Sequence, residues 1–229
     1  MKNGHPDVFL FDLDGTLIDS IELIRRSLEH TLAAHGFGQP THAQWLEGLG
    51  RPLKAQFAPL AADTRELEAM VRTYRSWNLA HHDAMVRAYD GVHEALDSLA
   101  AAGGRLGLVT SKQHVSARRG LERCGLAERF EVVVGADDVD QGKPAPDPVL
   151  LALELLGARP ERAVFVGDSP HDLTAGREAG TRTAAVLWGP FSREDLAPYE
   201  PDLWLERPAE LALLAGSPRR SRSGSARTR

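Results

Sequence analysis

Five short apolar runs alternate with helical segments along this chain, and that alternation is the feature that most restricts its fold. The runs cover residues 8–11, 105–110, 131–135, 163–167 and 184–188. They are often β-branched and lack strict polar alternation, which is typical of parallel strands buried on both faces. The helical segments between them end in glycine, a residue favoured just beyond a helix C-terminus. The pattern predicts an α/β domain with a doubly wound parallel sheet.

Residues 18–89 interrupt this alternation. They contain no strand-like run, and apolar residues recur there at helical spacing. We therefore expect an α-helical cap over residues 18–89, inserted into an α/β core formed by residues 1–17 and 90–216. The first cap helix is expected to be capped by Asp19 and Ser20.

Composition narrows the class of protein further. The chain has 229 residues, 42% of them hydrophobic, and a single cysteine, Cys124, so no internal disulfide can form. We see no signal peptide and no membrane-spanning run, and we expect a cytoplasmic protein. Residues 217–229 carry five arginines and no acid, and are expected to form a disordered basic tail. Nucleic-acid binding through this tail alone is not favoured over a solvated extension.

Polar residues gather where the predicted strands end. Ligands of open α/β sheets bind at the carboxyl ends of the strands. Several carboxylates in one cleft repel each other unless a cation lies among them, and Mg²⁺ prefers oxygen ligands. A hydroxyl, a lysine and the turn at Gly15 and Thr16 add groups that bind phosphate oxygens. The strand ends and the following loops supply Asp12, Asp14, Thr110, Ser111, Lys143, Asp168 and Asp172.

Four of these stretches resemble, in order, the four motifs of the haloacid dehalogenase (HAD) superfamily of phosphatases. They are FDLDGTLIDS, LGLVTS, GKPAPDP and GDSPHD. The resemblance implies a Rossmann-like core with a small α-helical cap between the first two motifs. Two further stretches, YRSWNLAHHDAMVRAYDGVHEAL and YEPDLWLERPAEL, resemble the HAD-type inorganic pyrophosphatase subfamily, which is close to the phosphoglycolate phosphatases.

The resemblance also implies a role for each residue. Asp12 is the expected nucleophile that forms an aspartyl-phosphate, and Asp14 the general acid and base. Thr110 and Ser111 are expected to bind the phosphoryl group, and Lys143 to neutralise it. The expected Mg²⁺ ligands are Asp12, Asp14 through its backbone carbonyl, Asp168, and Asp172 through a water.

Each motif taken alone also has a structural interpretation. Asp168 or Ser169 is also able to cap a helix that has Pro170 in its first turn, with Asp172 completing a capping box. The pair His81 and His82 is expected to lie at a solvated helix end rather than in a metal site.

Substrate choice is expected to lie in the cap turn at residues 48–57. Arg51 there is the candidate ligand for a second anionic group, and Lys54 is a weaker one. The favoured function is a Mg²⁺-dependent phosphohydrolase acting on a small phosphorylated substrate, with inorganic pyrophosphate and 2-phosphoglycolate leading. The alternatives are a phosphomutase of the β-phosphoglucomutase kind and, less favoured, a non-enzymatic binding protein. We expect a monomer or a homodimer.

Overall fold

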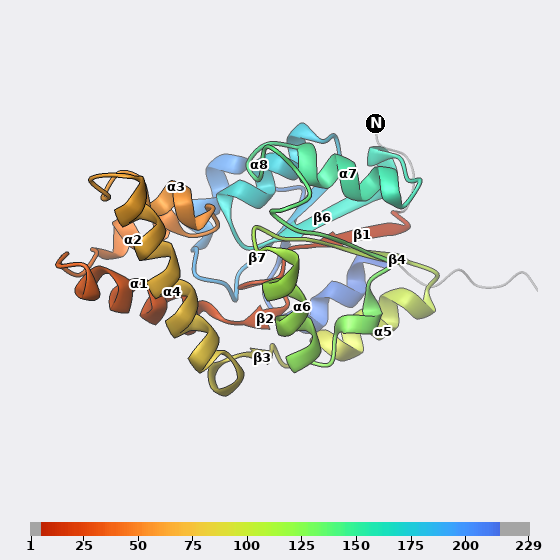
Figure 1. Cartoon of the computed structure of the whole chain (residues 1–229). Coiled ribbons are helices and arrows are strands. Elements are labelled where there is room, and N and C mark those ends of the chain that lie inside the picture. Colours follow the sequence, from red (N-terminus) through yellow and green to blue (C-terminus); the bar gives the residue numbers. More distant parts are fainter. Residues whose placement is uncertain (1–5, 216–229) are drawn as a thin grey trace, which may run out of the picture.

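The computed structural model describes residues 6–215, and the predicted basic tail lies outside them. A sheet lies between two layers of helices, beside the helices of residues 21–85 (Figure 1). Its six strands lie in the order β5-β4-β1-β6-β7-β8, and every neighbouring pair is parallel. Its strands are β1 (Val8–Phe11), β4 (Arg105–Val109), β5 (Val132–Val134), β6 (Ala163–Gly167), β7 (Arg182–Val186) and β8 (Leu203–Leu205). The doubly wound α/β fold predicted from the sequence is confirmed.

Both faces of the sheet are covered by helices. On β1, Val8 and Leu10 face one hydrophobic cluster, while Phe9 and Phe11 face another. The first cluster contains residues of α7 (Asp147–Leu155) and α8 (Pro170–Glu178). The second contains residues of α5 (Val92–Ala101), α6 (His114–Arg123) and the 3₁₀ segment η4 (Pro208–Ala215). Burial on both faces explains why these strands are continuous apolar runs.

The glycines predicted to end helices do so. Gly103 and Gly125 follow α5 and α6 with φ of 85° and 66°, and Gly157 and Gly180 follow α7 and α8 with φ of 57° and 80°. The shorter elements of this core are η1 (Ala127–Arg129), η2 (Pro160–Arg162), α9 (Arg193–Leu196) and η3 (Ala197–Tyr199).

Two details of the sheet differ from the sequence prediction. Strand β7 begins and ends two residues before the predicted run at residues 184–188. Its last predicted residue, Trp188, leaves the sheet, and the indole N–H of Trp188 donates to the carbonyl of Thr16 at 2.9 Å. The edge strand β8 was not among the predicted runs. It has only three residues, LWL, and charged residues flank it closely, so its pattern was too short to show a period.

Helices fill the segment predicted to be the cap. They are α1 (Ile21–Ala34), α2 (His42–Gly48), α3 (Leu53–Phe57) and α4 (Thr64–Met85), and a separate core that includes Phe57 and Met70 lies among them. One expectation here was wrong, because the segment does contain strands. The two tethers pair as β2 (Ile18–Asp19) and β3 (Arg87–Ala88), antiparallel. The division of the chain into cap and core domains stays a prediction.

Candidate active site

The carboxyl ends of four strands surround one cavity of about 1080 Å³ beneath α3 and α4. Asp12 and Asp14 reach it from the end of β1, Thr110 and Ser111 from β4, and Asp168 from β6, while Lys143 comes from the loop after β5. The cap turn with Arg51 lines the opposite wall. The structure therefore brings together most of the residues predicted from the strand ends.

Lys143 is the central cation of the site. Its Nζ lies 2.6 Å from Oδ1 of Asp12, 2.6 Å from Oδ1 of Asp172 and 3.2 Å from the carbonyl of Val109. The lysine side chain is only 4% exposed, so these contacts replace its water. A buried ammonium is stable in such a place only when anions and acceptors satisfy it, and the surrounding carboxylates raise the pKa of Lys143 despite its burial.

Asp12, Asp168 and Asp172 form a carboxylate triad, with one oxygen of each within 4.8 Å of the others. Burial is the main cause that raises the pKa of Asp12 to about 7, and Lys143 opposes it. Burial and the neighbouring Asp172 raise the pKa of Asp168 well above its usual value. When all three are ionised, the carboxylates exceed the one lysine by two charges, and all three offer oxygen ligands. This donor set fits a divalent cation such as Mg²⁺.

Asp172 also has the structural role that the sequence suggested. Ser169 is the N-cap of α8 and forms a capping box with Asp172, whose Oδ2 accepts hydrogen bonds from the Ser169 backbone N–H and hydroxyl. The other oxygen, Oδ1, accepts from Lys143. The capping interpretation is confirmed: the capping box uses Oδ2, and the contact with Lys143 uses Oδ1.

Asp14 lies apart from the triad. Its Oδ1 accepts hydrogen bonds from Lys112 Nζ at 2.5 Å and from the hydroxyl of Ser20. Ser20 occupies the N-cap position of α1 but makes no cap bond, so the expected capping role is wrong. Neither partner was assigned from the sequence. The available signal was the position of Lys112 two residues after Thr110, at the end of a strand.

The predicted contribution of Gly15 to phosphate binding needs a correction. Its backbone N–H donates to the carbonyl of Ile18 at 3.0 Å, within the tight turn that follows Asp14. The hydroxyl of Thr16 donates to Oδ1 of Asp168 at 3.2 Å, and Thr16 is fully buried. Neither residue lines the cavity. Thr16 holds Asp168 in place instead, and Gly15 leaves room for it, because a Cβ on Gly15 would lie 2.3 Å from Oδ2 of Asp168.

The other predicted phosphate ligands line the cavity. Thr110 is 3% exposed, and its hydroxyl accepts from the backbone N–H of Lys112 at 3.2 Å. Arg51 is exposed on the cap turn. That turn meets the core at His171, whose ring lies 3.2 Å from a Cβ built on Gly50. Burial lowers the pKa of His171, which was not predicted as a site residue.

The prediction that His82 lies at a solvated helix end was wrong. It is 3% exposed rather than solvated, because the end of α4 packs beside α6. Its Nδ1 lies 2.9 Å from Oδ1 of Asp83, and Arg119 of α6 donates to both oxygens of Asp83 at 3.0 and 2.8 Å. Its Nε2 is buried and makes no hydrogen bond within residues 6–215. Burial lowers the pKa of His82.

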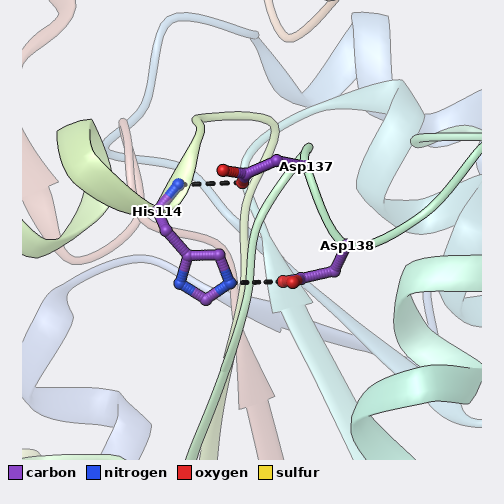
Figure 2. A group of neighbouring side chains, drawn as sticks. All are labelled: His114, Asp137 and Asp138. Atoms are coloured by element: carbon purple, nitrogen blue, oxygen red, sulfur yellow. Dashed lines mark hydrogen bonds and ion pairs between the residues drawn. The ribbon is translucent and has the colours of Figure 1, made fainter.

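A second group of possible metal ligands lies at the rim, where His114 meets Asp137 and Asp138 (Figure 2). The backbone N–H of His114 donates to Asp137 at 2.9 Å, and its Nε2 lies 2.5 Å from Asp138. Because Gln113 provides no side-chain cap for α6, Asp137 caps it from the neighbouring loop. The group thus joins the loops after β4 and β5, which carry Lys112 and Lys143.

Residues 9–186 match the family model described as haloacid dehalogenase-like hydrolase. The Pyrophosphatase PpaX of Anoxybacillus flavithermus is 42% identical over 210 residues, which cover 92% of this chain and 97% of that protein. The Pyrophosphatase PpaX of Bacillus velezensis is 43% identical over 216 residues, covering 94% and 99%.

Among solved structures, CbbY from Rhodobacter sphaeroides in complex with phosphate has a TM-score of 0.77 and 28% identity, covering 90% of this chain and 96% of that one. The family match spans the strand ends that carry Asp12, Asp14, Thr110, Lys143 and Asp168. The sequence motifs, the parallel sheet and these matches agree, and the chain belongs to the haloacid dehalogenase-like hydrolase family.

Proposed function

We propose that this phosphohydrolase cleaves inorganic pyrophosphate, with Mg²⁺, through an aspartyl-phosphate on Asp12. One observation carries the proposal: two carboxylates that are only two residues apart in the sequence lie in different environments. Asp12 is buried against Lys143, whereas Asp14 is held apart by Lys112 and Ser20. Carboxylates in different environments are able to take different roles, one as nucleophile and one as acid and base. The choice of pyrophosphate rests on the two relatives with that name.

In the first step, Oδ2 of Asp12 attacks phosphorus, because Oδ1 is held by Lys143. The bond from phosphorus to the leaving oxygen breaks, and Asp14 donates a proton to that oxygen. In the second step Asp14 takes a proton from water, the water oxygen bonds to phosphorus, and the bond to Asp12 breaks. Lys143 balances the charge of the transferring phosphoryl group in both steps.

The carboxylate triad would hold Mg²⁺, with Asp12, Asp168 and Asp172 as the nearby side chains and Asp14 contributing its carbonyl as predicted. The bound ion supplies positive charge that stabilises the phosphoryl oxygens. The protein holds these ligands rigidly: Thr16 donates to Asp168, and Ser169 donates to Asp172.

A panel of substrates tests this function. Phosphate release is measured from pyrophosphate, 2-phosphoglycolate, a sugar phosphate and an aryl phosphate, each with Mg²⁺ or EDTA. Pyrophosphate is expected to have the highest kcat/KM, and only with metal. A preference for another compound overturns the choice of substrate. Turnover of a sugar phosphate that requires a sugar bisphosphate identifies a mutase. A folded protein that turns over nothing supports the binding-protein alternative.

The nucleophile is tested separately. Asp12→Asn should abolish turnover while the protein remains folded, and residual activity above a few per cent contradicts the assignment. Acid-quenched wild-type protein should carry label from ³²P-pyrophosphate that hydroxylamine releases, and Asp12→Asn should carry none.

A further inference from the structure

The cavity extends to two sides of the strand that carries the catalytic carboxylates. In the sheet, β1 lies between β4 and β6. On the β6 side the lining includes His171 and the cap turn with Arg51. On the β4 side it includes Lys112 and Gln113, faced by Arg75 of α4. A substrate with two anionic groups can therefore place the second one on either side.

The contact that Asp14 makes indicates which of the two sides receives the leaving group. Its Oδ1 contacts Lys112, which follows β4, at 2.5 Å. Both side chains are partly open to the cavity, with exposures of 16% for Asp14 and 17% for Lys112. A general acid must lie within hydrogen-bond reach of the leaving oxygen. The leaving group is thus directed to the β4 side, away from Arg51.

Arg75 brings a second cation to this side. Its Nη2 donates to Oε1 of Gln113 at 2.8 Å, so a cap side chain touches the core loop that carries Lys112. Within residues 6–215 Arg75 makes no ion pair, and its charge is available to a ligand. A guanidinium from the cap and an ammonium from the core, both lining one cavity, suit a phosphate group.

His82 lies next to this subsite but is not part of it. It lines the same part of the cavity, and Lys112 is one of the charges that lower its pKa. The hydrogen bond between Nδ1 and Asp83 assigns the proton to Nδ1. The buried Nε2, which has no partner in the described chain, is then an acceptor. It lies 3.9 Å from a Cβ built on Gly120 of α6, so it faces the interface between α4 and α6 and the subsite rests on Lys112 and Arg75.

We propose that Lys112 and Arg75 form a second-anion subsite on the β4 side, which binds the distal phosphate of pyrophosphate. The inference rests on the proposed function. Asp12 attacks the proximal phosphorus, the bond to the bridging oxygen breaks, and that oxygen takes a proton from Asp14 and leaves with the distal phosphate. Lys112 and Arg75 bind this leaving orthophosphate. Arg51, the candidate from the sequence, is outside this subsite.

The test compares pyrophosphate with an aryl phosphate, which lacks the second anion. Arg75→Met should lower kcat/KM for pyrophosphate by about 10- to 100-fold, the range of a charge-assisted contact, and leave aryl phosphate within about twofold. Lys112→Met should affect both substrates, and pyrophosphate more. Arg72→Met is the matched control on the same helix, because Arg72 lies outside the cavity. Arg51→Met should change the preference between the substrates by less than about threefold.

A second measurement separates this inference from the choice of substrate. Methylenebisphosphonate, which cannot be hydrolysed, is used to inhibit aryl phosphate turnover. Arg75→Met should raise its inhibition constant about 10-fold or more, and the control Arg72→Met should leave it unchanged. If the wild-type protein does not hydrolyse pyrophosphate but Arg75→Met still raises the inhibition constant of methylenebisphosphonate, the proposed substrate is refuted and the subsite is retained. Equal losses on both substrates, or a loss confined to Arg51→Met, overturn the subsite.

Discussion

Replacing Lys143 by methionine tests whether one buried cation holds the acidic centre together. The lysine is 4% exposed and contacts Asp12 and Asp172 at 2.6 Å each. Methionine keeps most of the side-chain volume and removes the charge. The change therefore leaves the buried carboxylates without their cation and creates little empty space.

The expected size of the effect follows from these distances. Two unit charges 2.6 Å apart attract by about 6 kcal/mol at an effective dielectric constant of 20. Desolvation of each ion costs several kcal/mol, so the net value of the contacts is much smaller than their sum. Breaking a buried pair by removing one partner costs about 3–5 kcal/mol. Protonation of a triad carboxyl, whose pKa burial already raises, should limit the loss to the lower end of that range.

Urea unfolding in EDTA at pH 7 measures this loss of unfolding free energy. Lys143→Met should lose about 3 kcal/mol, and Mg²⁺ should reduce the deficit because it binds only the folded protein and supplies positive charge. Turnover should fall at least about 100-fold. Lys54→Met is the control, because Lys54 is exposed and forms no ion pair among the described residues. A loss below about 1 kcal/mol, or an equal loss in the control, would refute the reasoning.

Three further changes test other parts of the structure. Gly15→Ala adds a Cβ 2.3 Å from an oxygen of the carboxylate triad, and should weaken Mg²⁺ binding measured by calorimetry; Gly36→Ala, at nearly the same φ but with nothing within 4 Å, should not. Trp188→Phe removes the donor to the carbonyl of Thr16 and should cost about 1 kcal/mol in urea unfolding, and an unchanged midpoint contradicts this. His82 has a lowered pKa, so the unfolded chain binds its proton first as pH falls. The contribution of His82 to stability should therefore decline below about pH 6.5, so the wild type should lose stability relative to His82→Gln as the pH falls.

Local patterns predicted much of the fold. The run VFLF followed directly by Asp12 predicted a strand that delivers carboxylates to its carboxyl end, and β1 does so. GDSPHD predicted a capping box with Ser169 as a candidate N-cap and Asp172 as its partner, and α8 begins that way. Such features depend on neighbours within a few residues, which a sequence shows directly.

The sequence also determined that acids, hydroxyls and lysines follow several strands, and a parallel sheet brings such ends together. Asp12 and Lys143 are 131 positions apart, yet their atoms lie 2.6 Å from each other. The chemistry of the group followed from residue type and strand order. The pairing of particular atoms did not, because it depends on side-chain directions that the packing of the loops sets.

Only the tertiary structure decided which donors serve which acceptors. It directed the Gly15 N–H to a neighbouring carbonyl, gave Ser20 to Asp14 instead of to a helix end, and turned Lys112 toward Asp14. It also buried His82 between α4 and α6, against the prediction of a solvated helix end. Each outcome depends on contacts between segments distant in sequence, where burial removes water and leaves one partner within reach. The side proposed for the leaving group rests on the same packing, which places Lys112 against Asp14.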